Sequence, residues 1–142
     1  MAQAFLIGRL LVGAYYLMGA YHHFADVHMM TRAAAAHGVP APEAAVLVAG
    51  LLLAIAGVTL LLGAFPRVGV LALVLFLLPV TFFMHPFWAD TNPAVRMADT
   101  INFTKNMALL GSALMFLAVP EPWPYSVGPR LRLRRRIRVT TA

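Results

Sequence analysis

Four continuous apolar stretches divide the chain, at about residues 5–21, 44–62, 68–84 and 101–119. Each is close to the ~20 residues that a helix needs to cross ~30 Å of hydrocarbon. Backbone polar groups cannot stay unpaired in lipid, so a spanning segment is either a helix or part of a closed barrel. Barrel strands alternate polar and apolar residues, whereas these stretches are apolar throughout. The pattern predicts an all-α integral membrane protein, an antiparallel four-helix bundle.

Prolines, glycines and capping residues mark the ends of these helices. Gly63 and Pro66 form a turn so short that the second and third segments must be an antiparallel hairpin. Asp99 and Thr100 can cap the fourth segment. Pro79 lies inside the third segment, where a kink is expected.

Composition supports a membrane location for one small domain. Hydrophobic residues make up 61% of the 142 residues and charged residues only 11%, against about one quarter charged in an ordinary soluble domain. The chain has no cysteine, which excludes disulfides, thiolate metal sites and cysteine nucleophiles. The first apolar segment lacks the basic start and the small-residue cleavage site of a signal peptide, so we expect it to remain as a helix.

The net charge of +6 is concentrated at one end of the chain. Six of the eleven basic residues lie between Arg130 and Arg138, which divides the chain into a helical domain, 1–124, and an arginine-rich tail, 125–142. Beside a membrane, such a cluster indicates the cytoplasmic side and a contact with anionic lipid rather than with nucleic acid. Four crossings then place both termini in the cytoplasm and residues 22–43 and 85–98 on the outer side.

Small residues provide a surface on which the helices can pack closely. Gly50, Ala54 and Gly57 share one face of the second segment, and Gly13 and Gly19 lie in the first. Small residues at this spacing allow membrane helices to approach each other closely.

Polar residues gather at the outer end of the predicted bundle. All five histidines fall there, and the fourth segment enters the membrane from the same side with a polar stripe. A lysine and two asparagines are costly against lipid, so we expect them to face the bundle interior. We therefore predict a polar recess that can bind a cofactor, with these candidate residues: Tyr16, His22, His23, His85, Asn102, Lys105 and Asn106.

Structural roles compete with this interpretation. Lys105 could extend its ammonium group to the membrane surface without any function, and Arg9 could do the same at the cytoplasmic end. Trp88 and Trp123 suit the role of anchors at the membrane–water interface. The adjacent histidines point to different sides of a helix and none is paired at a four-residue spacing, so we expect no metal site.

Several blocks of sequence resemble the DoxX family of small four-helix membrane proteins, between about Gly8 and Val119. The more specific blocks are His85–Trp88 and Lys105–Gly111; the others include Gly8–Leu11, Gly19–Phe24 and Ala36–Pro42. The resemblance implies a bundle in the bacterial cytoplasmic membrane and a link to redox chemistry, since similar proteins include a subunit of a thiosulfate:quinone oxidoreductase. It supplies no catalytic residues.

Three functions remain open at this point. The first is an accessory or quinone-linked subunit of a membrane oxidoreductase, with the quinone in the recess and a partner redox protein exchanging electrons. The second is a non-enzymatic scaffold that recruits a soluble partner through its basic tail. The third is a small transporter, for which four short helices make a thin wall unless the protein forms a homo-oligomer.

Overall fold

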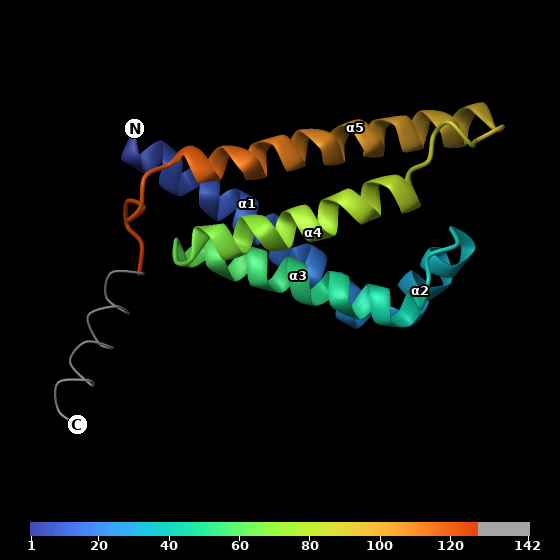
Figure 1. Cartoon of the computed structure of the whole chain (residues 1–142), viewed down its shortest axis with the longest axis horizontal. Helices are drawn as coiled ribbons and strands as arrows, with labels where there is room; N and C mark the ends of the chain where they lie inside the picture. Colours follow the sequence, from blue (N-terminus) through green and yellow to red (C-terminus); the bar gives the residue numbers. More distant parts are fainter. Residues whose placement is uncertain (128–142) are drawn as a thin grey trace, which may run out of the picture.

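A computed structural model describes residues 1–127, and all of the regular structure in that part of the chain is helical (Figure 1). Four helices are long and apolar enough to cross a membrane. The predicted arginine cluster, Arg130 to Arg138, lies outside the described residues. The elements, in order, are α1 (Ala2–Ala25), α2 (Val27–Ala36), α3 (Pro42–Leu62), α4 (Pro66–Met84), α5 (Pro93–Met115) and the short 3-10 helix η1 (Phe116–Ala118).

Prolines begin three of the long helices, where their fixed φ and missing N–H cost nothing. Pro42 begins α3, Pro66 begins α4 and Pro93 begins α5. Gly63 ends α3 with a φ of 63°, a left-handed conformation that favours glycine. The resulting turn joins α3 to α4 as the predicted hairpin.

The start of α5 differs from the sequence-based expectation. The side chain of Asn92 caps the helix by accepting hydrogen bonds from Ala94 N (2.9 Å) and Val95 N (3.3 Å). Asp99 and Thr100 are therefore not caps but lie within α5. The polar stretch before residue 101 resembles a loop in composition, yet an Asn–Pro start suffices to extend the helix beyond its apolar part.

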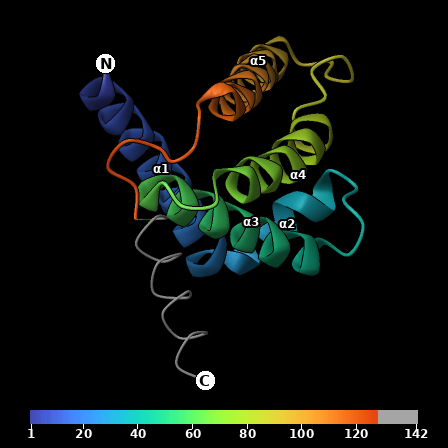
Figure 2. The same cartoon turned by 60° about the vertical axis from the view of Figure 1, so that its left-hand side comes forward.

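The helices pack in a more open arrangement than the bundle expected from the sequence. α3 packs against α1, α2 and α4, whereas α5 packs mainly against α4. α1 begins near the C-terminal end of α5 and then diverges from it (Figures 1 and 2). The two meet at that end, where Phe5 of α1 packs edge-to-face on Phe116 and Trp123.

Glycines bring α1 and α3 into close contact, as the small-residue pattern predicts. A Cβ atom on Gly13 would lie 3.1 Å from the Gly57 carbonyl oxygen, and one on Gly57 would lie 2.9 Å from the Gly13 carbonyl oxygen. The buried positions of α1 are Arg9, Gly13, Tyr16 and Ala20, so one helical stripe faces α3. The two backbones can approach this closely only because no side chain separates them.

The expectation that Arg9 reaches the membrane surface is wrong, because its side chain is buried to 2% exposure. Its guanidinium donates to the carbonyl oxygens of Leu60 (3.4 Å) and Tyr125 (3.0 Å). The last carbonyls of a helix lack partners within the helix, so the end of α3 offers acceptors to a cation. Gly63 makes room, since a Cβ there would overlap Arg9 Nη1.

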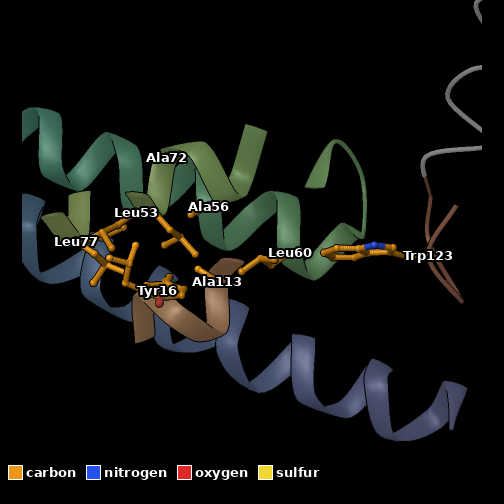
Figure 3. Packing of buried hydrophobic residues seen from close by; sticks show 11 residues of the cluster. Tyr16, Leu53, Ala56, Leu60, Ala72, Leu77, Ala113 and Trp123 are labelled. Carbon is orange, nitrogen blue, oxygen red and sulfur yellow. The ribbon is translucent and has the colours of Figure 1, made fainter. Parts of the chain in front are cut away.

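Trp123 is a core residue and not the interfacial anchor expected from the sequence. It is 2% exposed and belongs to the apolar cluster that runs through the molecule from Leu53 and Leu77 to Leu60 (Figure 3). Its indole Nε1 donates to the Val119 carbonyl (3.3 Å). Trp88, in contrast, is 55% exposed at the opposite end.

Candidate functional site

A cavity of about 310 Å³ lies between α1, α3, α4 and α5 in the half of the molecule that contains the histidines. This volume is at the small end of the range for ligand pockets, about 300–1,000 Å³. Apolar walls surround a few polar groups. The polar lining residues are Tyr15, Tyr16, His22, His23, His85 and Asn106, and the others are Met18, Gly19, Leu53, Phe76, Leu77, Val80 and Leu109.

Tyr16 is the most buried polar residue of the cavity, with 1% of its surface exposed. Its hydroxyl is buried and has no hydrogen-bond partner among the described residues. A buried hydroxyl without a partner costs about 1–3 kcal/mol, and this one belongs to a residue that lines the cavity. Figure 3 shows its ring packed among the core residues that include Leu53 and Leu77.

His23 is held in place from both sides. Its Nδ1 donates to the Gly19 carbonyl one turn earlier in α1 (2.8 Å), and its ring packs edge-to-face on Phe76 at 5.9 Å. A Cβ on Gly50 of α3 would lie 3.0 Å from the His23 Cβ. Because Gly50 has no side chain, His23 can pack at the α1–α3 interface beside the cavity.

His85 joins the end of α4 to α5 through a carboxylate. Its Nδ1 donates to Asp99 Oδ1 at 3.1 Å, and the side chains are only 22% and 14% exposed. Asp99 occurs within α5 because that helix begins early, at Pro93. The carboxylate that the sequence suggested as a helix cap thus forms a histidine–aspartate pair.

His22 lines the same cavity but at its exposed rim. Its Nδ1 lies 3.2 Å from Asp26 Oδ2, one turn later, and the two side chains are 52% and 43% exposed. Such an exposed pair contributes little to stability. It does give Nδ1 of His22 an acceptor oxygen.

α5 contributes Asn106 to the cavity, but not the other two predicted residues. Asn106 is 8% exposed, on the stripe that also buries Leu110 and Ala113. Lys105 is exposed and donates to Asn102 Oδ1 at 2.8 Å, so the expectation that Lys105 is buried in the recess is wrong. Adjacent residues of a helix point about 100° apart, and α5 packs mainly against one neighbour, which leaves only one stripe covered.

The sequence did not single out the apolar walls of the cavity or the partner of His85. Phe76, Leu77 and Val80 belong to an apolar run in which no residue stands out. Asp99 precedes the fourth apolar segment, and its nearness to His85 depends on how α5 lies on α4. Within residues 1–127, no three histidine, aspartate or glutamate side chains gather closely enough to hold a metal ion.

The family model described as DoxX matches residues 4–86, which is more than half of the chain. The chain belongs to the DoxX family. The matched DoxX region begins within α1, contains α2, α3, α4 and His85, and ends before α5, so Asp99 and Asn106 lie outside it. No curated protein and no solved structure matches the chain.

Proposed function

We propose that this DoxX protein is a quinone-linked accessory subunit of a membrane oxidoreductase, with a quinoid ring bound in the cavity. The observation that carries the proposal is the meeting of Tyr16, His23, His85 and Asn106 within one apolar cavity. Pockets for small aromatic ligands combine apolar walls with a few fixed polar groups in this way.

The cavity suits an apolar ring that carries oxygen atoms. Leu53, Phe76 and Leu77 supply apolar surface for the faces of the ring. The Tyr16 hydroxyl and the Asn106 amide can each donate or accept a hydrogen bond. Since the Tyr16 hydroxyl has no partner among the described residues, a bound oxygen atom would satisfy a group that is otherwise left without a hydrogen bond.

Electron exchange in this proposal depends on a partner redox protein. The chain has no cysteine, the usual ligand of iron–sulfur clusters. We therefore place the electron carrier in a second protein within the membrane or at its surface. The exposed Lys105–Asn102 pair on α5 supports such a partner, because a lysine in an apolar spanning helix is costly unless another group covers it.

The proposed location is the bacterial cytoplasmic membrane, with both termini inside and the cavity toward the outer side. The arginine-rich sequence after Val127 favours this orientation through the positive-inside rule. At the same end, Arg67 at the start of α4 lies 3.5 Å from Glu121, which follows η1. The histidine-rich end then faces the periplasm.

Binding of a short-chain quinone analogue to the purified protein in detergent tests the proposal. We expect saturable binding that weakens about tenfold in an Asn106→Ala variant, which loses an amide of the cavity that can donate a hydrogen bond to a ring oxygen. Lys105→Ala is the matched control, because its side chain lies outside the cavity, and it should bind like the wild type. Absence of saturable binding, or equal affinity in all three proteins, would refute a quinone site here.

A scaffold role is the second candidate, and the C-terminal segment favours it. Val127 N donates to the Leu62 carbonyl at 3.0 Å, and Arg9 donates to the Tyr125 carbonyl. Val127, the last described residue before the arginine-rich sequence, therefore lies beside the end of α3. Deleting residues 130–142 should release an acidic soluble partner from the membrane fraction while thermal stability stays unchanged. If the partner remains bound, the tail does not recruit it.

A further inference from the structure

The three histidines that line the cavity share one feature of hydrogen bonding. Nδ1 of His23 lies 2.8 Å from the Gly19 carbonyl oxygen, and Nδ1 of His85 lies 3.1 Å from a carboxylate oxygen of Asp99. Nδ1 of His22 lies 3.2 Å from a carboxylate oxygen of Asp26. In each case the partner is an oxygen that accepts hydrogen bonds, so Nδ1 must carry the proton.

This arrangement determines what each neutral imidazole offers to a ligand. A neutral histidine has one N–H and one nitrogen with a lone pair. With the proton on Nδ1, Nε2 becomes a hydrogen-bond acceptor, as in other sites where a second group sets the tautomer. His22, His23 and His85, which all line the cavity, therefore each carry an acceptor at Nε2.

The remaining polar groups of the cavity do not offset this excess of hydrogen-bond acceptors. Tyr15, Tyr16 and Asn106 can each act as donor or acceptor. Lysine, arginine and tryptophan, which only donate, are not among the described residues that line the cavity. Lys105, which the sequence suggested as a residue of the recess, is exposed and donates to Asn102 instead. The cavity is thus richer in acceptors than in donors.

From this count we infer that the cavity prefers the reduced, quinol form of its ligand to the oxidised quinone. A quinol has two hydroxyl groups that donate hydrogen bonds, whereas the two carbonyl oxygens of a quinone only accept. Quinol hydroxyls can pair with the Nε2 atoms, while quinone carbonyls would face those lone pairs without a hydrogen. The inference rests on the proposed function and adds the redox state of the ligand to it.

Asp99 is a positioning residue in this account. An ionised carboxylate accepts hydrogen bonds but cannot donate one, so Asp99 keeps the proton of His85 on Nδ1. An asparagine at the same place could instead donate its amide N–H to Nδ1 and move the imidazole proton to Nε2. A carboxylate that holds a histidine tautomer plays the same part in hydrolase triads, where the aspartate-to-asparagine change produces the wrong tautomer.

Calorimetric binding of tetramethyl-hydroquinone and tetramethyl-benzoquinone to the full chain in detergent tests this inference. At pH 8, where an ordinary imidazole is neutral, and without oxygen, we expect the quinol to bind about tenfold more tightly, as one additional net hydrogen bond gives. Equal affinities, or tighter binding of the quinone, would overturn the inference and leave the proposed function standing. Binding of neither ring would refute both.

The Asp99→Asn variant tests the mechanism of the preference. We expect the quinol-to-quinone affinity ratio to fall severalfold, and the ¹⁵N spectrum of His85 to show loss of the pure Nδ1–H tautomer. His37→Ala is the matched control, because His37 Nδ1 also bonds a backbone carbonyl, that of Ala33 (2.9 Å), but outside the cavity. If Asp99→Asn keeps the wild-type quinol-to-quinone affinity ratio and the wild-type ¹⁵N spectrum of His85, Asp99 does not position the imidazole. A changed affinity ratio in His37→Ala would also contradict the role of Asp99.

Discussion

Removing the hydroxyl of Tyr16 should have opposite effects on stability and on ligand binding. The ring is 1% exposed, and the hydroxyl is buried without a partner among the described residues. The cost of such a group is about 1–3 kcal/mol, and phenylalanine retains the packing of the ring. We therefore expect Tyr16→Phe to raise the free energy of unfolding by about 1 kcal/mol in the absence of ligand.

The same Tyr16→Phe variant should bind the quinone analogue about tenfold more weakly, because one hydrogen bond to the ring oxygen is lost. Urea unfolding in mild detergent and calorimetric binding measure the two effects. Tyr21→Phe is the matched control, since Tyr21 is 67% exposed and does not line the cavity; both quantities should stay unchanged. A loss of stability in Tyr16→Phe would show a structural partner for the hydroxyl, and unchanged affinity would show that the hydroxyl does not face the ligand.

Two further variants test the packing that positions the cavity, each by urea unfolding in detergent. Gly57→Ala would place a Cβ 2.7 Å from Leu17 Cγ, so we expect overpacking to lower the free energy of unfolding by about 2 kcal/mol. Gly111→Ala is the control: its Cβ would meet nothing within 4 Å, so the free energy of unfolding should rise by up to about 1 kcal/mol. Gly57→Ala at wild-type stability would contradict the close approach of the helices. Arg9→Ala should lower the free energy of unfolding by about 3 kcal/mol, because the charged hydrogen bonds to two carbonyls are lost. Arg67 is exposed, so Arg67→Ala should change the free energy of unfolding by less than about 1 kcal/mol. Equal effects of the two arginine variants would contradict a structural role for the buried side chain.

The sequence predicts the helical class and the four membrane-crossing segments because apolar length is a direct physical requirement of the bilayer. It is less informative about the start of the fourth helix. Arg96 and Asp99 make that stretch look like a loop, whereas Asn92 caps a helix that begins at Pro93. Capping is a local signal that competes here with the hydrophobic pattern.

The candidate site was predictable where residues lie on one buried stripe or at one end of a helix. Tyr16, His23 and His85 fall in the cavity, since their helices have a defined inner face. The rotation of α5 was not predictable, because its outer half carries polar residues in more than one direction and only its packing on α4 decides which one is buried. That packing covers Asn106 and leaves Lys105 exposed.

The buried positions of Arg9 and Trp123 could not be read from the sequence either. Both residues are common at membrane interfaces, and a single sequence does not show that the chain after η1 folds back. The hydrogen bond from Val127 N to the Leu62 carbonyl places that segment beside the end of α3. Its return supplies the Tyr125 carbonyl that accepts from Arg9 and brings Trp123 into contact with Phe5 and Phe116.

Photolabelling with an azido-substituted quinone, followed by peptide mapping, tests the central claim most directly. The account predicts that the label falls on the cavity segments of α1 and α4, between Tyr15 and His23 and between Phe76 and His85, and that excess unlabelled quinol analogue prevents it. Labelling spread over the exposed apolar residues of the helices, or labelling that the analogue does not prevent, would show that the cavity does not bind a quinoid ring.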